Sequence, residues 1–249
     1  ISNAEVGNGI GTAGVGYNTK FLPIKICPDG ASSVTAGYDG IVYAANHDCK
    51  VINCSWGMNA FSSYEYDIVK YATFNCDALI VAAAGNSANT DELYPASFPE
   101  VLSVGGTVSG DYVWYNSATS GTNYNRFIDI CAPAKGYHSL TNNDKVLSMS
   151  GGGTSFSAPI VSGVAALVRS KFPEMTALQV SEQLRMTSDD IYALNPEEMY
   201  VNRLGIGRVN AYKALTNTSV PGIRIKEMTQ KVVSDKPHIS ADDEIEITV

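Results

Sequence analysis

The sequence predicts an α/β fold in three layers, in which helices cover both faces of a mostly parallel sheet. Short apolar runs of strand length recur along the chain, as buried parallel strands do. Stretches with helical periodicity separate them, and this alternation predicts right-handed crossovers. One longer stretch is apolar nearly all round, which predicts a central, buried helix.

Five apolar runs are the predicted strands, at residues 21–27, 50–54, 78–84, 101–104 and 127–131. Helical patterns at residues 34–46 and 64–74 precede the second and third of them. The central helix is predicted at residues 154–171, where Ile160, Val164, Leu167 and Val168 recur at helical spacing. A second amphipathic helix follows at residues 176–185, and a short closing segment at 205–215.

The composition changes after residue 215. Residues 217–222 resemble a linker in composition, and residues 223–225 and 245–249 alternate in polarity as strands do. We therefore predict two parts: an α/β unit at residues 1–216, and at 217–249 a linker with the start of a truncated β-strand module.

Charge and cysteine content exclude several classes of protein. The chain has 17 basic and 25 acidic residues, a net charge of −8, which disfavours nucleic acid as a partner. Its apolar runs fall short of the ~20 residues that span a bilayer. The cysteines are scattered and odd in number, so we predict buried free thiols. They are Cys27, Cys49, Cys54, Cys76 and Cys131.

A glycine-rich turn presents Ser155 at the start of the central helix. Glycines let the backbone approach a substrate closely, and the positive end of the helix dipole favours the negative charge that forms when a hydroxyl attacks a carbonyl. Ser155 is therefore a candidate nucleophile. A serine in front of a helix is more commonly an N-cap, so the position alone does not decide between the two roles.

Several segments occur in the order found in one known family. They are Gly-Thr-Ser-Phe-Ser-Ala-Pro at 153–159 with the apolar helix at 161–167, Val-Ala-Ala-Ala-Gly-Asn at 81–86, Val-Ile-Asn-Cys-Ser-Trp-Gly at 51–57, and shorter matches at 94–105, 132–133 and 205–210. Over residues 6–215 the chain resembles the subtilisin-like serine peptidases, the subtilases. The resemblance implies a subtilisin-like fold and a serine endopeptidase that forms an acyl-enzyme on Ser155.

The resemblance also implies roles for further residues. Asn86 would join the backbone N–H of Ser155 in an oxyanion hole; the alternative is a turn residue after Gly85. The substrate-binding residues would be Ser55, Trp56, Gly57, Ala83, Ala84, Gly85 and Thr154. Trp56 stands where relatives carry a smaller aliphatic side chain, and it either narrows the cleft or packs in the core.

A structural calcium ion is a further implication, whereas the chemistry itself needs no cofactor. The predicted ligands are the carbonyls of Val6, Ile10 and Thr12 and the side chain of Asn8. Calcium takes six to eight oxygens, so the remaining carboxylate would come from sequence before Ile1. A turn that contains Asn-Gly for its own sake is the alternative.

The charge-relay aspartate and the histidine base of the family have no matching motif here. Relatives place the histidine motif shortly before the segment that resembles the start of this chain, so the N-terminal elements of the fold are expected upstream. His47, His138 and His238 lack the glycine- and threonine-rich setting of the family's base, and we interpret them as surface residues.

We therefore expect an endopeptidase that acts on polypeptides outside the cell or at its surface. This chain alone would be inactive, because serine without a base is a weak nucleophile, and its partner would be the upstream segment with the missing triad residues. The alternative is a non-catalytic peptide-binding domain that kept only the cleft. The presence of both Ser155 and Asn86 favours the peptidase, and the Gly-x-Ser-x-Gly pattern of lipases is not matched.

Overall fold

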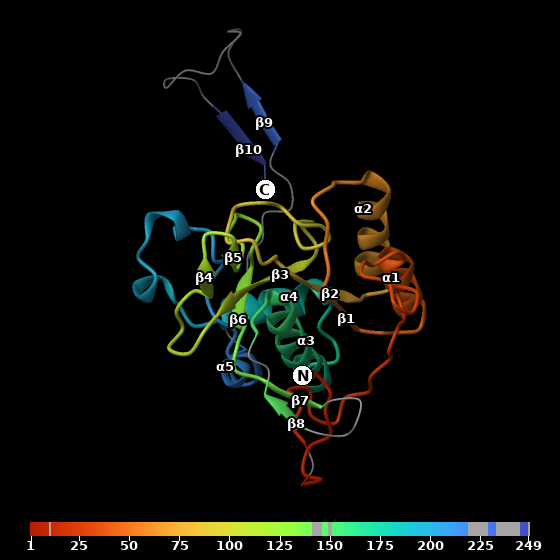
Figure 1. Cartoon of the computed structure of the whole chain (residues 1–249). Coiled ribbons are helices and arrows are strands. Elements are labelled where there is room, and N and C mark those ends of the chain that lie inside the picture. Colours follow the sequence, from red (N-terminus) through yellow and green to blue (C-terminus); the bar gives the residue numbers. More distant parts are fainter. Residues whose placement is uncertain (10, 141–145, 149–150, 219–228, 233–244, 249) are drawn as a thin grey trace.

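A sheet of four parallel strands forms the centre of the molecule (Figure 1). The computed structural model describes residues 1–9, 11–140, 146–148, 151–218, 229–232 and 245–248. The strand order is β1-β2-β3-β6. The bounds are Val51–Cys54 for β1, Leu79–Ala83 for β2, Leu102–Thr107 for β3 and Ile130–Pro133 for β6. The predicted α/β class and parallel sheet are confirmed.

Helices cover both faces of the sheet because side chains alternate along each strand. In β2, Leu79 and Val81 pack toward α3 (Thr154–Lys171), α4 (Ala177–Met186) and α5 (Ala211–Thr216). Ile80 and Ala82 pack toward α1 (Gly37–Asn46) and α2 (Ser63–Lys70). Every residue of β2 is buried, which explains its unbroken apolar sequence.

Local capping sets where the predicted helices begin. Thr176 and Gln179 form a capping box at the start of α4, and the Asn210 side chain accepts from the backbone N–H of Lys213 at α5. Ser62 caps α2 in the same way. The predicted helix at 64–74 continues beyond α2 as a π-helical turn, η1, at Tyr71–Asn75.

The predicted strand at residues 21–27 is wrong. Among the described residues this segment pairs with no strand. Its Ile26 carbonyl accepts instead from the N–H groups of Thr35 and Ala36. Phe21 is 67% exposed. A strand needs a neighbour as well as apolar residues, and within the described part of the chain β1 is the edge of the sheet.

The predicted strand at 127–131 begins three residues later than expected, at Ile130. The side-chain oxygen of Asn125 accepts a hydrogen bond from the N–H of Phe127. The backbone carbonyl of Asn125 accepts one from the N–H of Ile128, so a turn occupies this stretch. Short elements were not predicted: hairpins β4 (Tyr115–Ser117) with β5 (Ser120–Gly121) and β7 (His138–Leu140) with β8 (Val146–Ser148), and 3-10 turns η2 (Tyr192–Leu194) and η3 (Glu198–Tyr200).

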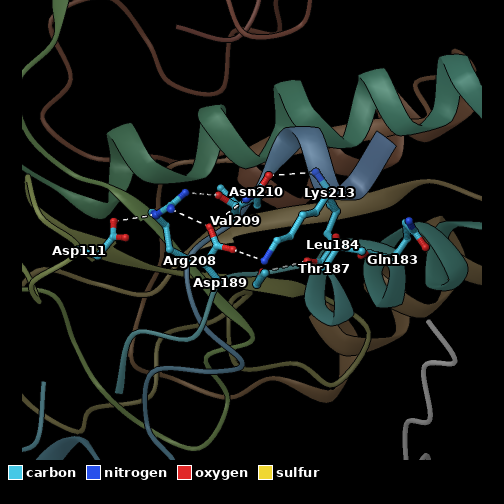
Figure 2. A network of polar contacts seen from close by, with 10 residues as sticks. Asp111, Gln183, Leu184, Thr187, Asp189, Arg208, Val209, Asn210 and Lys213 are labelled. Atoms are coloured by element: carbon cyan, nitrogen blue, oxygen red, sulfur yellow. Dashed lines mark hydrogen bonds and ion pairs between the residues drawn. The ribbon is translucent and has the colours of Figure 1, made fainter. Parts of the chain in front are cut away.

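The closing segment predicted at 205–215 is held in place by an ion-pair network. Arg208 pairs with Asp111 at 2.7 Å and with Asp189 at 2.7 Å, and Lys213 reaches Asp189 at 2.6 Å (Figure 2). The backbone on either side of Arg208 bonds to Cys131 in β6. The network thus joins three segments that are far apart in sequence.

At the C-terminal end, β9 (Thr229–Val232) and β10 (Ile245–Thr248) form an antiparallel hairpin. The predicted strand at 245–249 is confirmed over the bounds of β10, whereas the predicted strand at 223–225 lies outside the described residues. The division at residue 216 stays a prediction. Within the described ranges, no helix is long and apolar enough to cross a membrane.

All five cysteines are free thiols, as predicted. Burial raises the pKa of Cys54 and of Cys131 to about 12. The other three are only half-buried, because they lie outside the sheet: Cys27 in an irregular stretch, Cys49 after α1 and Cys76 after η1. The prediction of burial is therefore wrong for Cys27, Cys49 and Cys76.

Candidate active site

Ser155 lies in the first turn of α3 and contacts the end of β1. Its hydroxyl donates to the carbonyl of Ser55 at 3.2 Å. The hydroxyl of Ser55 donates in turn to the carbonyl of Ser155 at 3.0 Å. This reciprocal pair fixes the candidate nucleophile at the carboxyl edge of the sheet, where ligands of open α/β sheets bind.

Asn86 follows β2 and contacts the residue before Ser155. Its Oδ1 accepts from the backbone N–H of Thr154 at 2.8 Å and from the Thr154 hydroxyl at 2.9 Å. The carbonyl end of the amide is thereby occupied, which leaves Nδ2 as a donor. Among the described residues, nothing accepts a hydrogen bond from this Nδ2 or from the N–H of Ser155. Two donors, one on Asn86 and one on Ser155, are thus available on the two residues that flank Thr154.

Thr154 holds these parts together. Its side chain is buried, and its hydroxyl accepts from the N–H of Gly85 at 3.2 Å while also contacting Asn86. The Thr154 side chain thus positions Gly85 and Asn86 beside the start of α3, and the role of Thr154 in binding substrate stays a prediction.

The remaining predicted cleft residues divide into exposed and buried groups. Gly57, just after β1, is exposed, and Ser55 is half-buried. Ala83, Ala84 and Gly85 at the end of β2 are buried, and their contact with substrate stays a prediction.

Trp56 lies against α1. Its ring meets the Tyr38 ring edge-on, with centroids 5.2 Å apart, and a Cβ added to Gly37 would lie 2.6 Å from the indole. Trp56 packs against the hydrophobic cluster beneath α1 and α2. Of the two alternatives for Trp56, narrowing the cleft or packing in the core, this contact favours core packing.

Two side-chain hydrogen bonds in series near Ser155 were not predicted from the sequence. Ser162 in α3 donates to Asn53 Oδ1 at 3.0 Å, and Asn53 Nδ2 donates to the Ser55 hydroxyl at 2.9 Å. The two bonds connect the body of α3 to the strand end that holds the nucleophile. One signal could have indicated Asn53: it lies two residues before Ser55 and so on the same face of the strand.

The described histidines do not contact Ser155. His47 ends α1 with Nδ1 2.8 Å from the Tyr43 carbonyl and its ring stacked on Tyr43. His138 is exposed on β7. Both are surface residues, as predicted, and His238 lies outside the described residues.

The predicted calcium loop is closed at its base by a hydrogen bond from the Gly14 N–H to the Ala4 carbonyl at 2.9 Å. The Asn8 amide donates to Glu5 at 3.4 Å. Ile10 lies outside the described residues, and the four predicted oxygens fall short of the six to eight that calcium takes. The described residues therefore do not complete a calcium site, and the ion stays a prediction.

Comparison with known proteins assigns the family. Residues 3–215 match the sequence model of the Subtilase family. The chain belongs to the subtilases. It is 31% identical over 217 residues to the "Thermophilic serine proteinase" of Bacillus sp. (strain AK1), which covers 87% of this chain and 50% of that protein. It is 32% identical over 216 residues to "Thermitase" of Thermoactinomyces vulgaris, covering 86% and 72%.

The fold of this subtilase is similar to that of a solved protease from Pseudoalteromonas arctica PAMC 21717. The TM-score is 0.72 at 26% identity, over 86% of this chain and 67% of that one. The predicted family and fold are thereby confirmed. The chain spans about half the length of the Bacillus proteinase, so the activity of a whole protein is a matter of proposal.

Proposed function

We propose that this subtilase chain supplies the nucleophile and the oxyanion hole of a serine endopeptidase. The observation that carries the proposal is the contact of Asn86 Oδ1 with Thr154, the residue before Ser155, at the start of α3. This contact leaves two donors, Asn86 Nδ2 and the backbone N–H of Ser155, without an acceptor among the described residues. Donors arranged in this way stabilise negative charge on an attacked carbonyl oxygen. The helix dipole of α3 favours the same charge.

The reaction is acyl transfer. Ser155 Oγ attacks the carbonyl carbon of the peptide bond and its proton leaves to a base; the carbonyl oxygen becomes the oxyanion. The amine then departs with a proton, leaving an ester on Ser155 that water hydrolyses. Both donors act more strongly on the oxyanion than on the neutral carbonyl, and this difference lowers the barrier.

The base and its orienting carboxylate are proposed to come from a segment upstream of Ile1. The described part of the chain offers Ser155 only a backbone carbonyl as hydrogen-bond acceptor, and a peptide carbonyl is too weakly basic to act as a general base. We infer that the 249-residue chain alone is close to inert, since an unassisted serine is a weak nucleophile.

Polypeptides are the proposed substrates, and the cell exterior or surface is the proposed location. An extended peptide would lie beside the strand end at Ser55–Gly57, where Gly57 is exposed, and would use its backbone groups, as in β-strand addition. A non-catalytic peptide-binding domain would share this binding mode, but it would assign no function to Asn86 Nδ2. The two alternatives therefore differ in whether the loss of Asn86 lowers the rate of peptide cleavage.

The test compares variants of the protein that includes the upstream segment. Ser155→Ala should abolish cleavage, and Asn86→Ala should lower kcat ~10²–10³-fold with a smaller change in KM, a magnitude that comes from subtilisin itself, a member of this family. Asn46→Ala, at the exposed end of α1, is the control and should be unchanged. Full kcat in Asn86→Ala would refute the oxyanion assignment.

The second part of the test uses the 249-residue chain without the upstream segment. It should react slowly with a fluorophosphonate probe, and adding the upstream segment should give rapid labelling of Ser155, located by mass spectrometry. Rapid labelling of Ser155 in the bare chain would contradict the proposed need for an upstream base.

A further inference from the structure

Asn8 lies in an exposed loop and is the only asparagine of the chain that is followed by glycine. Residues 5–9 are all exposed and belong to no helix or strand. Gly7 and Gly9 have φ angles of +82° and +72°, and a Cβ built on either would have nothing within 4 Å. Solvent therefore has access to the peptide group that joins Asn8 to Gly9.

The backbone nitrogen of Gly9 is not engaged by the fold. Among the described residues, no carbonyl or side chain accepts a hydrogen bond from the Gly9 N–H. The loop is closed further out, where the Gly14 N–H donates to the Ala4 carbonyl at 2.9 Å. Asn8 Nδ2 donates to Glu5 Oε2 at 3.4 Å, which is longer than the usual 2.7–3.2 Å. The Gly9 nitrogen and the Asn8 side chain are thus free to approach each other.

The fold restrains other asparagines that precede a small residue. At Asn86, the N–H of the next residue, Ser87, already donates to Asn123 Oδ1 at 2.8 Å. Asn210 caps α5, and its side-chain oxygen accepts from the N–H of Lys213 at 2.9 Å. In each case a hydrogen bond holds the nitrogen or the side chain that would have to move. The structure therefore distinguishes Asn8 from asparagines that the sequence alone would place in one group with it.

We propose that Asn8 is a site of spontaneous deamidation, at which ageing of the folded protein converts asparagine to aspartate and isoaspartate. The Gly9 nitrogen attacks Asn8 Cγ, and the new C–N bond closes a succinimide ring. The bond from Cγ to Nδ2 breaks, and the amide proton of Gly9 passes through solvent to the departing nitrogen, which leaves as ammonia. Water then opens the ring at either of its carbonyls. Glycine favours the attack because it has no Cβ to obstruct the close approach of the backbone.

The product changes the charge of the loop. Aspartate at position 8 would place a second carboxylate where an amide now donates to Glu5, so repulsion would replace a hydrogen bond. Isoaspartate would also lengthen the backbone between the hydrogen-bonded ends of the loop at Ala4 and Gly14. The inference does not depend on the proposed peptidase function, because it needs neither Ser155 nor a substrate.

The main experiment incubates the 249-residue chain in buffer at pH 7 and at pH 9 and follows each asparagine by peptide mapping with mass spectrometry. Asn8 should convert first, with loss of ammonia and gain of water, and faster at pH 9 because the attack requires loss of the Gly9 amide proton. The product should contain isoaspartate, which a succinimide gives and direct hydrolysis of the amide does not. Asn59, exposed but followed by alanine, is the matched control and should convert more slowly.

A parallel incubation in urea separates the effect of the fold from that of the sequence. Asn8 should convert at nearly the same rate in buffer and in urea, because the fold does not restrain it. Asn86 and Asn210 should convert more slowly in buffer than in urea, and this difference also shows that the chain in buffer is folded. Gly9→Ala should slow the conversion of Asn8 in both solutions, and the urea measurement does not depend on how well the variant folds.

Three results would overturn the inference. They are conversion of Asn59 before Asn8 in buffer, an Asn8 that converts in urea but stays intact in buffer, and aspartate without isoaspartate at position 8. An unchanged rate at Asn8 in Gly9→Ala would also contradict it, because the attacking nitrogen would then not be that of Gly9. None of these results bears on the peptidase proposal, and failure of that proposal would leave the inference in place.

Discussion

Asp189→Asn should lower the free energy of unfolding by about 2–3 kcal/mol at pH 7. Asp189 accepts from Arg208 Nη2 at 2.7 Å, Asn210 Nδ2 at 2.9 Å and Lys213 Nζ at 2.6 Å (Figure 2). A hydrogen bond to a charged group contributes about 1.5–3 kcal/mol. The bond to Lys213, which is 51% exposed, is screened by solvent and contributes about 0.5 kcal/mol. In the variant Arg208 would still pair with Asp111. The loss of unfolding free energy therefore stays below that caused by leaving a buried charge without a partner.

The effect should depend on pH. Burial alone would raise the pKa of Asp189, but the hydrogen bonds from Lys213 and Asn210 and the charge of Arg208 outweigh it and hold the pKa below the ordinary value of 3.8. The stabilisation is therefore present above the ordinary carboxyl pKa and is lost as the pH falls through the lowered one. Urea unfolding at pH 7, 5 and 3 measures it, with Lys213→Ala as the mild control. A difference at pH 7 under about 0.5 kcal/mol, the range of ordinary surface changes, or one that persists undiminished below the folded pKa, would refute the reasoning.

Three further predictions concern the rest of the chain. Gly163→Ala should destabilise by about 1 kcal/mol despite the gain in helix propensity, because the new Cβ would lie 2.8 Å from Val15 Cβ and 2.9 Å from the Gly16 nitrogen; thermal unfolding measures it, and Gly151→Ala, with nothing within 4 Å, is the control. Iodoacetamide at pH 8 should alkylate Cys27 well before Cys54 and Cys131, whose thiols burial keeps protonated; equal rates by mass spectrometry would contradict this. Limited proteolysis should cut first within residues 217–222, and uniform resistance there would argue for one continuous domain.

The parts of the fold that could be predicted are those in which local pattern and tertiary burial agree. The central helix was predicted with the bounds that α3 has, because its apolar character on every side matches a helix buried between the sheet and its neighbours. The run at 78–84 was likewise recognised as a strand covered on both faces. The run at 21–27 was misassigned, because its apolar residues indicate strand propensity but pairing depends on a distant partner.

In the candidate active site, too, features marked by a local sequence pattern could be predicted and long-range contacts could not. Ser155 and Asn86 stand in contiguous motifs, so the sequence alone singled them out. The residues that position them act across long separations: Ser162 bonds to Asn53 109 residues earlier in the chain, and the Ser55 hydroxyl donates to the carbonyl of Ser155, 100 residues later. The two-residue spacing of Asn53 and Ser55 places both on one face of the strand, but no local pattern identifies their partners on α3, since these contacts depend on how the strand end and the helix meet in space.

The hydrogen bond from Ser155 to the Ser55 carbonyl bears on how the nucleophile would be activated. A base that takes the Ser155 proton must first replace this carbonyl as the acceptor of the hydroxyl. A neutral hydrogen bond contributes only about 0.5–1.5 kcal/mol net, so the exchange costs little compared with the barrier that a base removes. An imidazole is the stronger acceptor, and its approach would release the Ser55 carbonyl at the strand end, where an extended substrate needs acceptors for its own N–H groups. The resting contact therefore holds the hydroxyl in place without opposing catalysis, and the inertness proposed for the bare chain is attributed to the absent base.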